Sequence, residues 1–324
     1  MNRVLMTGGT GCIGAATAYV LASRGVDEIL IATSSAKPGS LGLWFGEAID
    51  PRIKLVKTDV ADADEVRRLV TGFQPSEMIH LGAFQSPDCE AYPTRGMEVN
   101  VGGTMNMLNA AAELKGTLER FVFASSAAVY GPKDFYPDPL IRETDTLAPP
   151  NLYGIWKVAG EHLARQFQAR TGIDTISLRL NTTYGKGRDK GKTSAPTTAM
   201  KAVAMGIPYR MPYFRRENYH FVEDVAAHFA SCALDPFEGY GVFNLRGQTM
   251  EVAEFLALIG EVANDLGMGP ADLGIAPDAT PASFACDLDD SAIQIAFPHV
   301  GRTPVQEGIR KTLLAFRQAK PMNA

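Results

Sequence analysis

The chain has 324 residues, which is about two domains at roughly 150 residues each. Its 46% hydrophobic and 21% charged residues are typical of a globular protein and exclude extensive disorder, collagen and coiled coil. The 31 basic and 36 acidic side chains give a net charge of −5 without a basic run, which argues against nucleic acid as a partner. No apolar run approaches the ~18 residues of a membrane span, and the first residues do not resemble a signal segment, so we expect a cytoplasmic protein without membrane contact.

The cysteines predict free thiols and no metal site. They lie far apart, form no C-x-x-C motif and have no histidine at metal-ligand spacing. The four residues are Cys12, Cys89, Cys232 and Cys286.

In the first 180 residues, short apolar runs alternate with amphipathic stretches. The predicted strands are residues 3–7, 28–33, 53–58, 78–81, 121–125 and 175–180, and the predicted helices are 15–24, 63–73, 101–115 and 153–170. This alternation predicts an α/β fold with a Rossmann-type doubly wound parallel sheet, covered by helices on both faces. In such sheets ligands bind at the carboxyl ends of the strands, where the strand order reverses.

Beyond about residue 184 the alternation loosens. A polar loop at 185–192 precedes predicted helices at 195–205, 222–234, 252–266 and 305–319, with a strand at 241–245. We predict an NAD(P)-binding Rossmann domain over residues 1–180, with a return segment near 219–247. Residues 181–218 and 248–324 form a smaller, mostly α, substrate-binding lobe in this prediction.

A glycine-rich segment, TGGTGCIG at residues 7–14, joins the first predicted strand to the first predicted helix. Glycine has no Cβ, so this backbone can turn sharply and approach a pyrophosphate resting on the helix N-terminus. A tight turn without a ligand is the alternative, but the position between strand and helix favours dinucleotide binding. The predicted cofactor contacts here are Gly8, Thr10, Gly11, Cys12, Ile13 and Gly14.

The second strand lacks the acidic residue that binds the adenosine ribose 2′-hydroxyl in many NAD sites. Residues 31–37 read IATSSAK. The hydroxyls of Thr33, Ser34 and Ser35, with Lys37 nearby, could hold a 2′-phosphate, so the sequence favours NADP over NAD. The alternative is a loop that is polar because it lies at the surface.

Two further segments are expected to contact the cofactor. Asp59 and Val60 follow the third strand, where the carboxylate could accept from adenine or cap the next helix. Leu81, Gly82 and Ala83 end the fourth strand, where the small Gly82 and Ala83 permit close approach of the cofactor.

The fourth strand also ends near two expected substrate contacts, Gln85 and Ser86. His80 stands before them in an apolar strand. We interpret it as a hydrogen-bonded core histidine rather than a catalyst.

The catalytic candidates are Tyr153 and Lys157, four residues apart on one helical face, and Ser126 at the end of the preceding strand. A nearby ammonium lowers the pKa of a tyrosine from its usual ~10, which makes Tyr153 a proton-transfer group. Ser126 would bind the same substrate oxygen while nicotinamide exchanges hydride with the carbon.

These motifs together resemble the extended short-chain dehydrogenase/reductase family, also called NAD-dependent epimerase/dehydratase, over nearly the whole chain. The resemblance implies that Lys157 also binds the nicotinamide ribose and that Ser125 supports Ser126. It implies that Asn100, grouped here with the cofactor residues, stabilises the active-site edge of its helix. Family members commonly dimerise through the helices after Asn100 and around Tyr153, so we expect a homodimer.

Two departures bear on the reaction. Sugar 4,6-dehydratases of the family have an Asp-Glu pair after the catalytic residue, whereas Ala127 and Ala128 stand here and cannot transfer protons. Nucleotide-sugar members usually have Arg seven residues before Asp224, whereas this chain has Glu217, which would repel a diphosphate unless a neighbouring arginine such as Arg215 compensates.

Residues 192–200 resemble the segment of family dehydrogenases that lines a short pocket for a small substrate. Arg188, Arg210 or Arg215 could pair there with a carboxylate or could form a solvated rim. Tyr184, Tyr213 and His220 could wall the pocket or pack the lobe. The predicted substrate contacts are Gln85, Ser86, Ser126, Asn181, Ser194, Thr197 and Arg215.

The sequence therefore predicts an NAD(P)-dependent oxidoreductase acting on a secondary alcohol or ketone of a small polyhydroxylated substrate, such as a sugar acid, polyol or hydroxy acid. One alternative is a nucleotide-sugar epimerase with the same Ser-Tyr-Lys site. A second is a non-catalytic NAD(P)-sensing protein, although such proteins usually lose the tyrosine.

Overall fold

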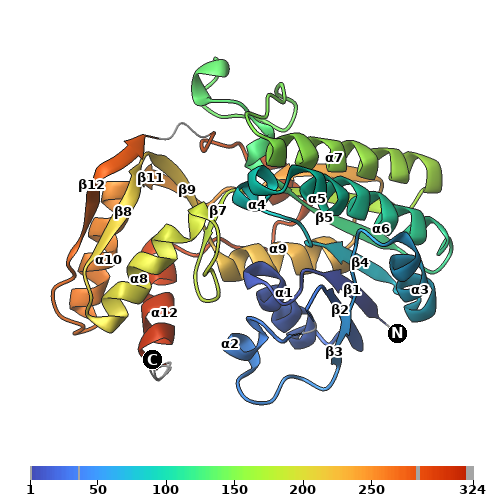
Figure 1. The fold of residues 1–324 in the computed structure, drawn as a ribbon, viewed down its shortest axis with the longest axis horizontal. Coiled ribbons are helices and arrows are strands. Elements are labelled where there is room, and N and C mark those ends of the chain that lie inside the picture. Colours follow the sequence, from blue (N-terminus) through green and yellow to red (C-terminus); the bar gives the residue numbers. More distant parts are fainter. Residues whose placement is uncertain (1, 36, 282–284, 319–324) are drawn as a thin grey trace.

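The structure, a computed structural model, describes residues 2–35, 37–281 and 285–318. Its centre is a seven-stranded parallel sheet with the order β10-β6-β5-β4-β1-β2-β3 (Figure 1). The strands are β1 Arg3–Thr7, β2 Glu28–Thr33, β3 Ile53–Lys57, β4 Glu77–His80, β5 Arg120–Ser126, β6 Asp174–Leu180 and β10 Tyr240–Asn244. The order runs outward in both directions from β1, which confirms the predicted Rossmann-type doubly wound sheet.

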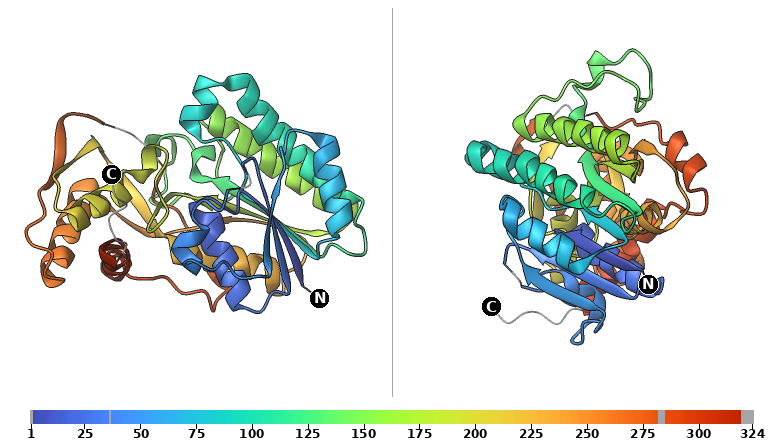
Figure 2. Two further views of the ribbon diagram at one scale, coloured as in Figure 1. Left: turned by 60° about the horizontal axis from the view of Figure 1, so that its bottom comes forward. Right: turned by 90° about the vertical axis from the view of Figure 1, so that its right-hand side faces the viewer.

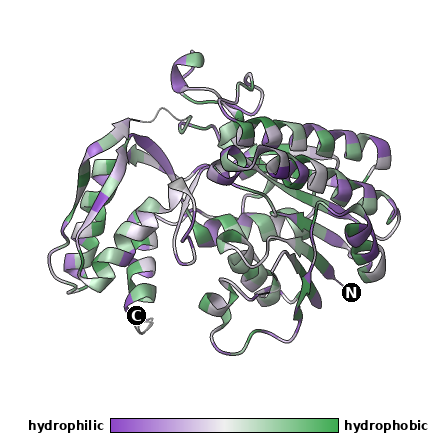
Figure 3. Ribbon diagram, in the orientation of Figure 1, coloured by the Kyte–Doolittle hydropathy of each residue, from purple (hydrophilic) through white to green (hydrophobic). Residues whose placement is uncertain are grey.

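Helices cover both faces of this sheet (Figure 1). On one face lie α1 Cys12–Ser23 and α9 Val222–Leu234, and on the other lie α3 Ala63–Phe73, α6 Gly103–Ala112 and α7 Leu152–Thr171. Successive side chains of β1 point to opposite faces of the sheet. Val4 and Met6 pack with α1 and α9, whereas Leu5 packs with the other three helices. Figure 3 shows hydrophobic residues along these strands. The sheet is therefore buried on both faces.

Short helical elements connect β2 to β3 and β4 to β5. These are α2 Leu41–Phe45, α4 Ser86–Ala91, α5 Pro93–Met97 and a π-helical turn at Glu98–Gly102 that leads into α6. After β5 the chain forms 3-10 turns at Ala127–Val129 and Lys133–Phe135 before α7 begins.

The C-terminal lobe is helical, as predicted, and also contains two small sheets beside the helices (Figure 2). Its helices are α8 Ala195–Met205, α10 Val252–Asp265 and α12 Val305–Gln318, and Lys192–Ser194 forms a 3-10 turn. The short helix α11 Ser291–Ala296, which the prediction placed in the lobe, packs instead against β10 of the central sheet. One sheet has the order β11-β9-β7, and the other pairs β12 with β8. The strands are β7 Thr182–Tyr184, β8 Tyr209–Phe214, β9 Arg216–Phe221, β11 Gln248–Glu251 and β12 Leu273–Pro281. The sequence pattern does not predict these strands.

The predicted boundary after residue 180 stays a prediction. The predicted lobe includes residues 282–284 and 319–324, and the predicted last helix ends at 319; these positions lie outside the described residues.

The core of the lobe is aromatic. Tyr184, Tyr219 and Phe255 are buried, and the rings of Tyr219 and Phe255 stack with centroids 3.9 Å apart. Tyr213 and His220 are also buried, and His220 is hydrogen-bonded to Asn218 at 2.6 Å. Tyr184 and Tyr213 pack in the core of the lobe, whereas His220 also lines a pocket.

The cysteines of the chain are buried and unpaired. Burial raises the pKa of Cys12 and of Cys286 to about 12 and that of Cys89 to about 11, so these thiols are protonated at neutral pH.

Over the described ranges no helix is both long and apolar enough to cross a bilayer. In the same ranges no cluster of three His, Cys, Asp or Glu side chains is arranged to hold a metal ion.

Candidate active site

The glycine-rich loop brings the end of β1 against the end of β4. Gly8 has φ +69°, and a Cβ there would lie 2.8 Å from the backbone nitrogen of Gly82. A Cβ at Gly14 would lie 2.4 Å from the carbonyl oxygen of Gly8. Side chains are thus excluded at both positions, and a backbone cradle forms at the strand-order switch.

The cradle ends at an uncapped helix. Gly11 is the N-cap of α1 and offers no side-chain oxygen, and the first turn contains no acidic residue. The first amide groups of such a helix lack partners within the helix and carry a partial positive charge. The predicted contacts Cys12, Ile13 and Gly14 supply these amides, which fits a dinucleotide pyrophosphate.

At the expected adenosine end of the cofactor site, the hydroxyl groups of the residues at the end of β2 differ in their exposure. Thr33 is buried and its Oγ1 lies 3.2 Å from Oγ1 of Thr10. Ser34, Ser35 and Lys37 are exposed. The sequence of residues 31–37 contains no aspartate or glutamate.

The side chain of Asp59 is half-exposed and forms an ion pair with Arg95. Burial works to raise the pKa of Asp59, but hydrogen bonds from the backbone of Ala61 at 3.0 Å and from Arg95 outweigh it and lower the pKa. The N-cap of α3 is Asp62, whose side chain accepts from the backbone of Glu65 at 2.9 Å. The alternative that Asp59 caps this helix is therefore wrong.

The end of β4 is held by buried hydrogen bonds. His80 Nδ1 lies 2.6 Å from Oγ1 of Thr7, and its Nε2 lies 3.1 Å from Oγ1 of Thr104. Burial lowers the pKa of His80 to about 3, so the ring is neutral at pH 7, as expected for a core histidine. Asn100 accepts from the backbone nitrogen of Phe84 at 2.7 Å and donates to its carbonyl at 3.0 Å. Asn100 therefore fixes the backbone of Phe84, directly after the predicted cofactor contacts Leu81, Gly82 and Ala83.

The proposed catalytic side chains meet where β5 ends and α7 begins. Ser126 is the last residue of β5, and its Oγ accepts from the backbone of Ala128 at 3.1 Å. Tyr153 is the second residue of α7 and Lys157 stands one turn later. Nζ of Lys157 lies 5.5 Å from the centroid of the Tyr153 ring.

A glycine makes this approach of α7 to β5 possible. A Cβ at Gly154 would lie 2.1 Å from the carbonyl oxygen of Ala128. The N-cap Asn151 accepts from the backbone of Gly154 at 2.9 Å and so fixes the start of α7. Tyr153 is thereby held next to the segment that follows Ser126.

Burial dominates the electrostatics of the site. It lowers the pKa of Lys157 to about 8, and Nζ donates to the carbonyl of Ala124 at 2.6 Å. Burial also raises the pKa of Tyr153, more than the hydrogen bond from Ser126 and the charge of Arg188 lower it. The expected lowering of the tyrosine pKa by Lys157 is therefore not found, because desolvation of the phenol outweighs the charges around it.

A buried ion pair that the sequence analysis missed lies behind these residues. Glu161 binds Arg179 through two hydrogen bonds of 2.9 and 2.8 Å and accepts from Oγ of Ser125. Arg179 also donates to the hydroxyl of Tyr130. Ser125, predicted to support the site, thus belongs to a network that joins β5, α7 and β6. Glu161 follows Lys157 by four residues on the same helical face, which is the signal that could have found it.

The predicted substrate residues fall into different environments. Gln85 is the N-cap residue of α4 and Ser86 its first residue. Asn181 donates to the carbonyl of Ala285 at 3.1 Å, and Ser194 to that of Gly191 at 2.8 Å.

Two other predicted substrate contacts are in more buried surroundings. Thr197 is 1% exposed and its Oγ1 accepts from the backbone of Gly185 at 3.2 Å. Arg215 forms an ion pair with the fully buried Glu217, which also accepts from the hydroxyl of Thr182 at 3.0 Å. The carboxylate that would repel a diphosphate is thus compensated by Arg215.

A model of the NAD dependent epimerase/dehydratase family matches residues 4–245, which is most of the chain. The chain belongs to this family. It is 28% identical over 214 residues to a UDP-glucose 4-epimerase of Azospirillum brasilense, covering 65% of this chain and 58% of that protein. It is 28% identical over 285 residues to a dTDP-glucose 4,6-dehydratase of Neisseria meningitidis serogroup B, covering 84% and 79%. An uncharacterized epimerase/dehydratase of Staphylococcus saprophyticus is 34% identical over 185 residues, and the chain spans 53% of its length.

Solved structures agree with this membership. The UDP-glucose 4-epimerase of Thermus thermophilus, in complex with NAD, has a TM-score of 0.80 and 26% identity, with 98% of this chain and 100% of that chain covered. The UDP-glucose 4-epimerase of Thermotoga maritima, with UDP-glucose, has a TM-score of 0.81 at 20% identity, covering 97% and 98%, and shows the fold alone.

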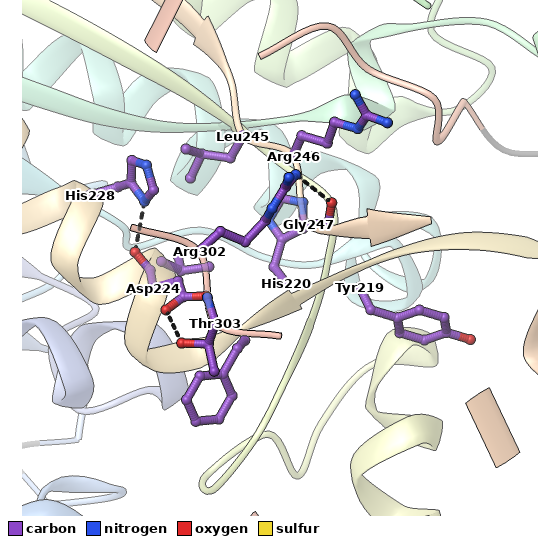
Figure 4. A pocket seen from close by; sticks show the side chains of 11 residues that line it. Tyr219, His220, Asp224, His228, Leu245, Arg246, Gly247, Arg302 and Thr303 are labelled. Atoms are coloured by element: carbon purple, nitrogen blue, oxygen red, sulfur yellow. Dashed lines mark hydrogen bonds between the residues drawn. The ribbon is translucent and has the colours of Figure 1, made fainter. Parts of the chain in front are cut away.

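One pocket of this family member contains none of the predicted catalytic residues (Figure 4). It lies between β9, the start of α9 and the loop from β10 to β11. Asp224, near the start of α9, accepts from the hydroxyl and the backbone nitrogen of Thr303 at 2.6 and 2.7 Å. Figure 4 shows this pair beside His228 and Arg302. Asp224 therefore ties the chain before α12 to α9.

Proposed function

We propose that the chain catalyses NAD-dependent oxidation and reduction at a secondary alcohol carbon of a sugar, with epimerisation of a nucleotide sugar as the leading reaction. The observation that carries this proposal is the meeting of Ser126, Tyr153 and Lys157 beside the glycine cradle. Family membership and the epimerases among the relatives support it. They favour epimerisation over the small-substrate dehydrogenase that the sequence predicts.

The residues divide the chemistry as follows. Tyr153 exchanges a proton with the substrate oxygen, and Ser126 donates a hydrogen bond that orients the same oxygen. Lys157 provides positive charge beneath the Tyr153 ring at 5.5 Å, which opposes the cost of forming a phenolate in a buried place. When bound, the nicotinamide cofactor supplies the hydride acceptor and donor.

Elimination of water is not part of the proposal. It needs a further acid and base beside the substrate, and the two residues after Ser126 are the buried alanines Ala127 and Ala128. Although the chain is similar to a dTDP-glucose 4,6-dehydratase, we therefore do not propose that it catalyses dehydration.

A dehydrogenase of a small polyhydroxylated substrate is the second candidate. The observation that favours it is the ion pair between Glu217 and Arg215. Because Glu217 neutralises Arg215, the pair carries no net positive charge that could attract a diphosphate. A non-catalytic NAD(P) sensor is disfavoured by the complete set of Ser126, Tyr153 and Lys157.

Incubation with UDP-glucose and a small fraction of an equivalent of NAD distinguishes these candidates. An epimerase converts the sugar to its epimer with no net accumulation of reduced cofactor. A dehydrogenase accumulates reduced cofactor in proportion to the NAD added. If neither product forms with UDP-glucose or with a panel of sugar acids, polyols and hydroxy acids, the proposal of hydride transfer fails.

NADP is proposed as a cofactor that the site accepts at least as well as NAD. Support comes from the exposed hydroxyls of Ser34 and Ser35 and from the lack of an acidic side chain at the end of β2. Titration with NADPH and NADH tests the choice, and clearly tighter binding of NADH would overturn it.

A further inference from the structure

Arg188 has hydrogen-bonding capacity that its surroundings do not use. It lies in the loop between β7 and the 3-10 turn Lys192–Ser194 and is partly buried. One guanidinium nitrogen donates to Oγ1 of Thr193. Its Nε is shielded from solvent and has no hydrogen-bond partner in the described parts of the chain. A buried donor without a partner is costly, and a ligand that accepts from this Nε would remove that cost.

Three other arginines of the lobe pair with carboxylates, whereas Arg246 shares with Arg188 an Nε that is shielded from solvent and has no hydrogen-bond partner among the described residues. Arg215 pairs with Glu217, Arg216 with Asp287 at 3.2 Å and Arg210 with Asp272 at 2.7 Å. Within the described residues Arg188 forms no ion pair with a carboxylate, and the neighbouring Asp189 pairs with Lys201 instead at 2.8 Å.

The charge of Arg188 acts on the active site. Burial raises the pKa of both Tyr153 and Cys12, and the positive charge of Arg188 works against it at each. Tyr153 lies at the start of α7 and Cys12 at the start of α1. Arg188 therefore stands within electrostatic reach of both the proposed proton-transfer group and the glycine cradle.

A second polar side chain reaches the same place from the loop after β4. Gly191 has φ +86°, and a Cβ there would lie 2.1 Å from Oε1 of Gln85 and 3.8 Å from Nη2 of Arg188. The glycine thus lets the loop turn closely around these two side chains. Gln85 and Arg188 thus converge at Gly191, the first with an amide and the second with a guanidinium group.

We propose that Arg188 binds an acidic group of the substrate, a carboxylate or a phosphate carried by the sugar close to the carbon that is oxidised. Guanidinium groups bind such oxyanions through paired, charge-assisted hydrogen bonds, and the unused Nε provides one of them. The inference rests on the proposed function, and it names the substrate class as acidic sugars. The pyrophosphate of the cofactor is the competing source of the same chemistry.

Calorimetric titration of the NAD-loaded protein with matched neutral and acidic sugars tests the inference. The pairs are UDP-glucose with UDP-glucuronic acid, and glucose with glucuronate. In at least one pair, the wild type is expected to bind the acidic sugar at least about tenfold more tightly than the neutral one. This is the gain in affinity that one charge-assisted hydrogen bond provides. Arg188→Gln should abolish that preference, Arg188→Lys should retain part of it, and the affinity for NAD should stay unchanged.

Lys190→Gln is the matched control, because it removes one positive charge from an exposed position of the same loop. It should keep the preference for the acid. The inference is overturned if the acid does not bind more tightly in either pair, or if the preference survives in Arg188→Gln. A loss of NAD affinity in Arg188→Gln would assign the residue to the cofactor phosphates. Failure of the wild type to bind NAD would contradict the proposed function instead.

Discussion

The chemistry of the Lys157 ammonium group depends strongly on its surroundings. It is 4% exposed and donates to a backbone carbonyl, and burial brings its pKa from the ordinary 10.5 to about 8. Near neutral pH the group keeps its proton, but with a small margin. The charge that stands beneath Tyr153 is therefore sensitive to moderate alkalinity.

This lowered pKa predicts a pH dependence of stability. Between pH 8 and 10.5 the unfolded chain binds a proton at Lys157 that the folded chain has released, so the free energy of unfolding rises with pH through this group. Denaturant unfolding of the wild type and of Lys157→Met across this range measures the effect. The stability of the wild type relative to the variant should increase with pH; a flat or falling difference would show that the lysine is not desolvated in the folded protein.

At the scale of elements, the contact between the start of α7 and the turn after β5 determines the site. Strand β5 ends at Ser126 and the following 3-10 turn is buried, so α7 can approach only where its surface is small. Gly154 provides that surface, and the ion pair of Glu161 with Arg179 holds the same helix against β6. The geometry of Tyr153 follows from how these elements pack.

Gly154→Ala is expected to displace the first turn of α7, because the new Cβ would lie 2.1 Å from the carbonyl oxygen of Ala128. Overpacking of this kind typically costs about 1–3 kcal/mol of stability. A displacement of Tyr153 by about 1 Å should slow turnover roughly 100-fold. Thermal unfolding and steady-state rates measure the two effects.

Gly260→Ala is the control for this change. Gly260 lies within α10, and an added Cβ there meets nothing within 4 Å. The substitution should leave activity unchanged and stabilise the protein by up to about 1 kcal/mol through helix propensity. Equal effects of the two substitutions would mean that the contact with Ala128 does not position α7.

At the scale of the whole molecule, the Rossmann half was predictable because two signals coincide there. Apolar runs buried on both faces alternate with amphipathic helices, and the glycine segment marks where the first strand turns into the first helix. The small sheets of the lobe were not predictable in the same way. Strands β8 and β12 contain Pro212 and Pro277, which disfavour a strand assignment, and β9 is buried over five consecutive residues instead of alternating.

The candidate site, like the fold, could be predicted from the sequence only in part. Ser126, Tyr153 and Lys157 have spacing that shows in the sequence, whereas the direction of the Tyr153 pKa shift depends on burial that spacing does not reveal. Thr197 belongs to a segment with the polarity of a pocket wall, yet tertiary packing buries it. The unused donor of Arg188 could be recognised only once its neighbours were known.

Hydride transfer with Tyr153 as the proton-transfer group is tested most directly by measuring the rate of substrate conversion in the wild type and in Tyr153→Phe, with the dissociation constant of NAD measured for both. The variant should bind NAD within about twofold of the wild type and turn over at least about 100-fold more slowly, because it lacks the hydroxyl that exchanges the proton. If Tyr153→Phe binds NAD normally and keeps more than about a tenth of the wild-type rate, the role assigned to Tyr153 is wrong.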